Sequence, residues 1–129
     1  MKISSTMVRA LLGYVTTGWF EDHAEPPQSL EDIADAVRSM RAVAQASGDL
    51  PWLKIALGYL LTDGEAEIGM ISPSLRMRPE DDVRDMLFLT WEGLYPGEPP
   101  PAPGQGPAVE FAPMSAEDWL EYRQAVYGG

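Results

Sequence analysis

Acidic side chains at helical spacing are the residues of this chain best suited to bind a cation. Three segments share a short acidic signature, at residues 29–35, 79–85 and 115–121. Each segment places several carboxylates within about one helical turn, close enough for neighbouring side chains to share a metal ion or a cationic group. The pattern therefore indicates either a binding site or the acidic first turn of a helix.

The middle segment is the one whose spacing favours metal chemistry. Asp81, Asp82 and Asp85 resemble the aspartate-rich magnesium motif of isoprenoid synthases, and that resemblance implies a metal-dependent enzyme that uses these three carboxylates. The chain is far shorter than the large helical cavity of those enzymes requires, and few bases lie nearby to hold a diphosphate. Acids facing the positive end of a helix dipole explain all three segments at once, and we prefer this interpretation.

No other segment carries the residues of a catalytic centre. The chain has no cysteine, and His23 is its single histidine, which excludes thiolate catalysis and a histidine-rich metal site. His23 lies among Glu21, Asp22 and Glu25, a set that we interpret as a solvated loop. No Gly-x-Ser-x-Gly elbow and no phosphate-binding glycine-rich loop occurs. We therefore expect a protein that is not an enzyme and needs no cofactor or metal.

The excess of acid is the strongest constraint on partners. Twenty Asp and Glu face nine Lys and Arg, for a net charge of −11. No base occurs between Arg9 and Arg38, and Arg84 is the single base among ten acids in residues 79–122. Such a surface repels phosphate, so we expect no direct binding to nucleic acid or to a membrane, whereas a basic protein surface would be attracted. Solubility alone is the simpler explanation of the same charge.

Apolar periodicity predicts the elements that must position these residues. The length suits a single domain, 1–129, and we expect a compact, mainly α fold of about five helices with a minor β element. Residues 15–17 are β-branched, so a strand competes with the first helix there. The predicted helices cover residues 5–17, 29–47, 50–63, 79–92 and 115–127. Residues 65–71 are predicted to form a strand or an extended edge segment, and residues 108–112 a short strand.

Two of these segments have distinctive compositions. Residues 50–63 are apolar nearly all round, which predicts a central, buried helix. Residues 95–107 contain six prolines and three glycines, which predicts a Pro/Gly-rich linker or surface arm before the last helix. No apolar run approaches the length of a membrane span, and no secretion signal is evident, so we expect a cytoplasmic protein.

Two functional hypotheses follow. The first is a non-enzymatic acidic interaction domain that docks on a basic surface of a partner protein. It is similar in composition to small acidic inhibitors carried by bacteriophages, which implies a nucleic-acid mimic occupying a nucleic-acid-binding surface. The second is a structural subunit of a homo-oligomer or larger particle, assembled through the 95–107 arm and the C-terminal helix. The predicted partner-binding residues are Trp19, Glu21, Asp22, Glu25, Glu31, Asp32, Asp35, Asp81, Asp82, Asp85, Tyr95, Glu117, Asp118 and Glu121.

Overall fold

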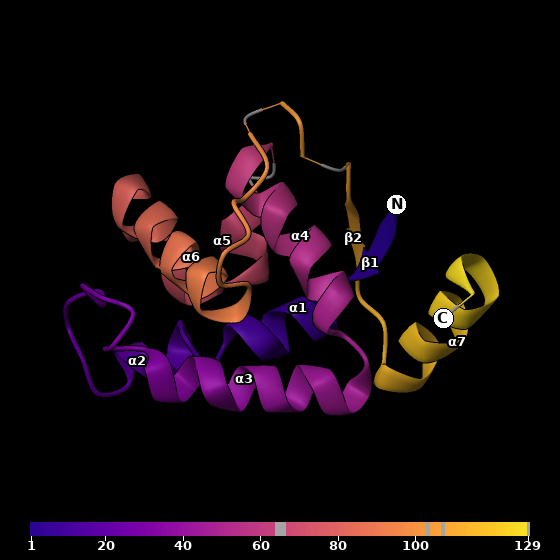
Figure 1. Ribbon diagram of the computed structural model, residues 1–129, viewed down its shortest axis with the longest axis horizontal. Helices are drawn as coiled ribbons and strands as arrows, with labels where there is room; N and C mark the ends of the chain where they lie inside the picture. The colour runs from indigo at the N-terminus through magenta and orange to yellow at the C-terminus, as the bar shows by residue number, and fades with distance from the viewer. Residues whose placement is uncertain (64–66, 103, 107, 129) are drawn as a thin grey trace.

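Helices make up most of the molecule (Figure 1). The computed structural model describes residues 1–63, 67–102, 104–106 and 108–128. Within that part, five helices have eight or more residues, and the sheet has two strands, so the fold is mainly α with a minor β element, as predicted. The elements are β1 (Lys2–Ser4), α1 (Ser5–Leu12), α2 (Thr17–Phe20), α3 (Ala34–Ser47), α4 (Leu50–Thr62), α5 (Ile68–Ile71), the 3₁₀ turn η2 (Pro73–Leu75), α6 (Glu80–Leu94), β2 (Glu110–Ala112) and α7 (Ala116–Tyr127).

Helix α4 forms the centre of the core, as its apolar sequence predicts. Leu53, Ala56 and Leu57 are fully buried, and the helix packs against both α3 and α6. Pro51 lies in the first turn, where its missing N–H removes no helical hydrogen bond. The buried side chains of α1, α3, α4, α6 and α7 form one hydrophobic cluster around this helix.

Two short strands bring the first and last parts of the chain together. β1 pairs with β2 in parallel, with Lys2 opposite Glu110 and Ser4 opposite Ala112. The strand predicted at 108–112 is confirmed for its last three residues. β1 is absent from the sequence predictions because three residues are too few for an alternation signal. The Tyr127 hydroxyl accepts the Lys2 N–H at 2.9 Å and donates to the Lys2 carbonyl at 2.8 Å, which ties α7 to β1.

The first helix is shorter than its periodicity predicts. α1 ends at Leu12, and the prediction that it extends to residue 17 is wrong. The hydroxyl of Thr16 donates to the Leu12 carbonyl at 2.8 Å, while Val15 enters the core. The β-branched residues therefore leave the helix for a buried turn, and a separate single-turn helix, α2, follows.

The second long helix begins five residues later than predicted. The Ser29 hydroxyl accepts the Asp32 N–H at 3.4 Å, so the expected cap contact is present. The chain then forms three-residue turns, and the first regular helical bond of α3 joins the Val37 N–H to the Ile33 carbonyl at 2.9 Å. The serine thus caps the turn that leads into α3, which itself begins at Ala34.

The strand predicted at 65–71 is wrong where the structure describes it. Residues 68–71 form the helical turn α5, and residues 64–66 lie outside the described part. Ile68 packs against the core and Ile71 is buried, a spacing of three that suits a helical turn better than a strand.

The acidic signatures mark the starts of helices in two of three cases. Three acids occupy the first turn of α6, and two occupy the first turn of α7, where the Ser115 hydroxyl also accepts the Asp118 N–H at 3.1 Å. In α3 only Asp35 lies in the first turn. α6 ends at Leu94 and includes Gly93, which the sequence predicts as its end.

The Pro-rich segment, residues 95–102 and 104–106 of the described chain, first crosses the helices and then arches above them (Figure 1). The indole N–H of Trp91 donates to the Glu98 carbonyl at 2.6 Å, and the Glu98 carboxylate pairs with Lys54 of α4 at 2.8 Å. Further along, Pro101 lies against Gly58, where a Cβ atom would come within 3.2 Å of its ring. The described part of the predicted arm therefore crosses its own helices before the chain reaches β2.

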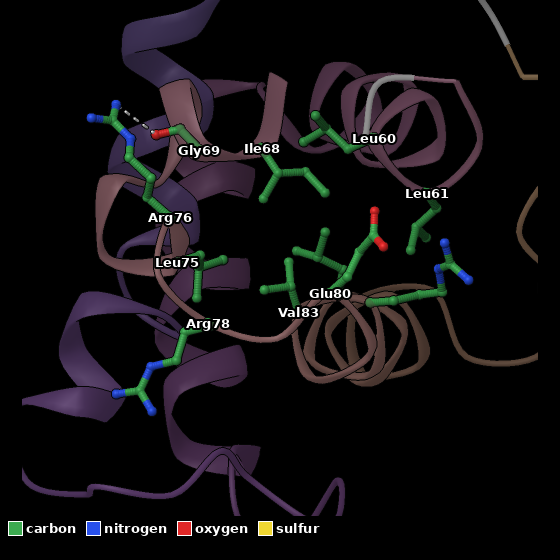
Figure 2. Close-up of a pocket in the computed structure, with 11 residues that line it drawn as sticks. Leu60, Leu61, Ile68, Gly69, Leu75, Arg76, Arg78, Glu80 and Val83 are labelled. Atoms are coloured by element: carbon green, nitrogen blue, oxygen red, sulfur yellow. Dashed lines mark hydrogen bonds between the residues drawn. The ribbon is translucent and has the colours of Figure 1, made fainter. Parts of the chain in front are cut away.

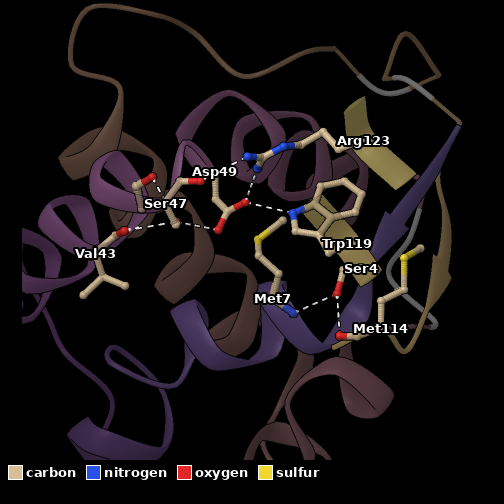
Figure 3. Close-up of polar contacts among 9 residues, drawn as sticks. Ser4, Met7, Val43, Ser47, Asp49, Met114, Trp119 and Arg123 are labelled. Atoms are coloured by element: carbon tan, nitrogen blue, oxygen red, sulfur yellow. Dashed lines mark hydrogen bonds and ion pairs between the residues drawn. The ribbon is translucent and has the colours of Figure 1, made fainter. Parts of the chain in front are cut away.

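A buried polar cluster holds α7 in place (Figure 3). Asp49, between α3 and α4, accepts a hydrogen bond from the Trp119 indole at 2.8 Å and pairs with Arg123 at 2.6 Å. The same guanidinium donates to the Ser47 carbonyl at 3.1 Å. Because both charged side chains are removed from water, the predicted C-terminal helix is fixed by an internal ion pair as well as by apolar packing.

Candidate functional site: an acidic groove along helix α6

The predicted partner-binding acids fall into two groups. Glu117, Asp118 and Glu121 lie on α7, at one end of the long axis, whereas α6 and the chain from residue 21 to residue 35 lie toward the other end (Figure 1). All the predicted acids are exposed except Asp82, which is half-buried. The three acidic segments therefore do not form one continuous face.

The two aromatic residues predicted to anchor a partner, Trp19 and Tyr95, donate hydrogen bonds to carbonyls of their own chain. The Trp19 indole donates to the Glu25 carbonyl at 2.7 Å, and its ring stacks on the imidazole of His23 with 3.6 Å between centroids. Tyr95 is only 7% exposed, and its hydroxyl donates to the Leu50 carbonyl at 2.8 Å. Burial also raises the pKa of Tyr95 far above the usual value for tyrosine. Its sequence suggests a loop residue, but the structure places it in the core.

A groove runs along α6 and brings together residues that are distant in the sequence. It consists of two adjoining hollows of about 350 and 500 Å³ that share Phe88 and Glu92 in their walls. We call the two hollows together the α6 groove. The first also contains Asp82 and Asp85, and the second extends to Glu98 on the Pro-rich segment. Two of the predicted aspartates thus line a concave surface, whereas Asp81 does not.

One face of α6 provides the floor of this groove. Asp82, Asp85, Leu89 and Glu92 follow each other at spacings of three, four and three residues, which keeps them on one side of a helix. Phe88, at the same spacing of three from Asp85, adds an aromatic ring to this face. Carboxylates therefore lie at both ends of an apolar middle.

Proline-rich segments line the groove beside α6. In the first hollow these are Pro26 and Pro27 of the loop before α3, and in the second they are Pro96, Pro99 and Pro100. The loop is anchored through Arg78, whose guanidinium lies 3.8 Å from the ring centroid of Phe20 and donates to the Ala24 carbonyl at 3.0 Å. Both segments are therefore attached to the body of the molecule and give the groove a defined shape.

Most arginines whose contacts are described bind backbone carbonyls. Arg41 donates to the carbonyls of Gly93 and Leu94 at the end of α6. Arg76 and Arg78 also bind main-chain oxygens. No lysine or arginine of the described chain lines either hollow of the α6 groove, although Lys54 reaches Glu98 from α4. The groove therefore carries a concentrated negative charge.

A larger hollow, of about 560 Å³, lies between α4, α5 and the start of α6 (Figure 2). Its lining is mainly apolar, and Arg76, Arg78, Glu80 and Arg84 also line it. Figure 2 shows Arg76 turned toward the Gly69 carbonyl and Arg78 turned away from the hollow. Arg76 and Arg78 therefore do not converge on the hollow, and its other charged lining residues are Glu80 and Arg84, four residues apart on α6.

The described residues show no arrangement for metal binding. Among them, no three or more His, Asp or Glu side chains are close enough to hold an ion together. Asp81, Asp82 and Asp85 are adjacent on α6 without forming such a set, so the metal-dependent alternative has no ligand geometry there. In the described part of the chain, no helix is both long enough and apolar enough to cross a bilayer.

Several groove residues are absent from the sequence predictions. Phe88, Leu89 and Glu92 belong to no acidic signature, although their spacing from Asp82 and Asp85 marks them as one helix face. Pro26, Pro27 and Glu98 carry no local signal at all, because only the packing of their segments brings them to α6.

Comparison with protein-family models, with curated proteins and with solved structures found no match to this chain.

Proposed function

We propose that this protein is a non-enzymatic interaction domain that binds a basic segment of a partner protein in the α6 groove. The observation that carries this proposal is the composition of the groove: Asp82, Asp85 and Glu92 surround Phe88 and Leu89, with no basic side chain from the described residues in its walls. Carboxylates there would steer a cationic partner into place, and burial of the apolar middle would slow its release.

The narrower hypothesis, a phage-type inhibitor that occupies a nucleic-acid-binding surface, is one form of this proposal. The acidic composition supports it, because a basic surface evolved for phosphate would also accept carboxylates. The separation of the α7 acids from the groove favours recognition through one concave site over mimicry along a continuous acidic face.

The assembly alternative depends on the Pro-rich segment reaching a neighbouring subunit. In the described part, that segment contacts its own chain through Glu98 and Pro101. We therefore prefer the interaction function. The assembly alternative predicts an oligomer, which a measurement of the protein's molecular mass in solution would reveal.

The test compares two variants of equal charge change. One carries Asp82→Asn, Asp85→Asn and Glu92→Gln in the groove, and the matched control carries Asp118→Asn, Glu117→Gln and Glu121→Gln on α7. Each variant loses three negative charges, including at least one from the first turn of a helix. Both are immobilised and exposed to lysate of the native host at low and at high salt.

We expect the wild-type protein and the α7 variant to retain the same basic proteins at low salt and the groove variant to lose them. High salt should release them from the wild-type protein and from the α7 variant, because exposed charges separated by more than about 10 Å are screened at roughly 0.1 M salt. Equal retention by both variants would contradict the proposal, and so would retention that salt does not change.

A further inference from the structure

The dimensions of the α6 groove indicate what kind of chain segment it accepts, an inference that rests on the function proposed above. Successive residues of a helix rise by about 1.5 Å, so Asp82 and Glu92 are separated by roughly 15 Å along the axis. Measured along the helix axis from Asp82, the midpoint of the Asp82–Asp85 pair lies at about 2 Å and the midpoint of the Phe88–Leu89 pair at about 10 Å. The groove therefore presents an acidic, an apolar and a second acidic position in that order.

The two hollows adjoin along α6 through the shared residues Phe88 and Glu92, so one segment of a partner can lie against both.

The side-chain spacing of an extended strand matches the three positions. Alternate residues project to the same side and are about 6.6 Å apart, so the first, third and fifth residues lie at roughly 0, 7 and 13 Å. The groove positions, measured from the Asp82–Asp85 pair, lie at about 0, 7.5 and 13 Å. An extended segment of five residues thus places a basic side chain at each acidic position of the groove and an apolar side chain at the apolar position between them.

Arginine suits the first position better than lysine. Asp82 and Asp85 are separated by about 4.5 Å along the axis, a distance that one planar guanidinium can bridge with two hydrogen bonds. The neighbouring ring of Phe88 offers a surface on which the same plane can stack. Glu92 can accept either cation.

We propose that the α6 groove binds an extended segment of a partner protein with the pattern basic-x-apolar-x-basic. The occupant is a peptide, because charge alternates with apolar surface at the repeat of a polypeptide strand. Asp82 and Asp85 bind the first basic residue, the apolar residue packs on Phe88 and Leu89, and Glu92 binds the second basic residue.

The experiment measures fluorescence anisotropy of a labelled, blocked peptide, Gly-Arg-Ser-Leu-Ser-Arg-Gly, added to the full chain. A second peptide of identical composition, Gly-Arg-Arg-Leu-Ser-Ser-Gly, places both arginines together. We expect the first to bind at least tenfold more tightly than the second. Since both peptides have the same charge and are tested on the wild-type protein, this comparison does not depend on the folding of any variant.

A charge-matched pair of variants locates the site. Asp85→Asn with Glu92→Gln should weaken the first peptide at least tenfold, whereas Glu117→Gln with Glu121→Gln on α7 should leave it within about twofold. Circular dichroism verifies that both variants are folded.

The outcomes separate this inference from the proposed function. Equal binding of the two peptides, with both weakened by the groove variant, would overturn the spacing rule and leave the basic-segment function standing. Equal weakening by the groove and α7 variants would overturn the assignment of the site. Absence of binding by the first peptide, while the lysate experiment still shows groove-dependent partners, would also refute the extended-segment inference alone.

Discussion

Removing the carboxylate of Asp49 should strongly destabilise the protein through the buried cluster that holds α7. The side chains of Asp49 and Arg123 are only 12% and 7% exposed, and one oxygen of Asp49 accepts from both Trp119 and Arg123. Within the described structure, the Nε of Arg123 already lacks a hydrogen-bond partner. The Asp49→Ala variant would leave this guanidinium buried with no acid beside it.

Breaking one side of a buried ion pair costs about 3–5 kcal/mol, because the remaining charge stays desolvated. That loss is a large part of the roughly 5–15 kcal/mol by which a domain of this kind is stable. For a chain of this length, the melting temperature should fall by about 10–20 °C. Urea unfolding followed by circular dichroism gives the free energy, and hydrogen exchange shows whether α7 detaches before the remaining helices.

Two controls make the prediction specific. Asp35→Ala breaks the exposed pair with Arg38, whose side chains are 95% and 77% exposed, and should cost less than about 1 kcal/mol. Adding Arg123→Met to Asp49→Ala removes the stranded charge, so the double variant should be more stable than the sum of the single changes predicts, by about 1–3 kcal/mol. A loss below about 1 kcal/mol for Asp49→Ala, or strict additivity of the two substitutions, would refute the reasoning.

Two further predictions concern Gly93 in α6 and Tyr95, the residue that follows this helix. A Cβ on Gly93 would lie 2.9 Å from the Cγ1 atom of Val37. Gly93→Ala should lower the free energy of unfolding by up to about 2 kcal/mol, because crowding of about 1–3 kcal/mol exceeds a helix-propensity gain of about 1 kcal/mol. Urea unfolding should show that Val37→Ala partly restores this loss, and an unchanged midpoint for Gly93→Ala would contradict the close approach. Burial raises the pKa of Tyr95, so the folded state retains the phenolic proton more strongly than the unfolded chain. The contribution of Tyr95 to stability should therefore be constant below the usual tyrosine pKa of about 10 and be lost as the pH rises above it. Tyr95→Phe should weaken that alkaline loss and cost about 1 kcal/mol at neutral pH through the lost bond to Leu50, whereas an identical pH profile for both proteins would contradict this assignment.

The candidate site could be predicted from the sequence only in part. The patterns single out Asp82 and Asp85 as cation-binding residues, and both line the groove. The same patterns add the α7 acids, which lie at the other end of the molecule, and omit Phe88 and Glu92. Charge is visible residue by residue, whereas a concave surface depends on which segments pack beside each other.

The sequence by itself determined the features that depend on neighbouring residues. The burial of α4 follows from its apolar composition, and the start of α7 follows from Ser115 and the acids that come after it. The excess of negative charge also needs no coordinates. These features are local or compositional, because helix caps and amphipathic faces involve residues within about one turn of each other.

Only the tertiary structure decided the arrangements that join distant segments. β1 pairs with a strand more than 100 residues away, Asp49 holds Arg123 across 74 positions, and the groove unites residues 26–28 with α6 and the Pro-rich segment. The late start of α3 and the helical turn at residues 68–71 likewise reflect core packing that overrides local preference. Contacts of this kind arise from the shared burial of segments whose separation in the chain leaves no periodic signal.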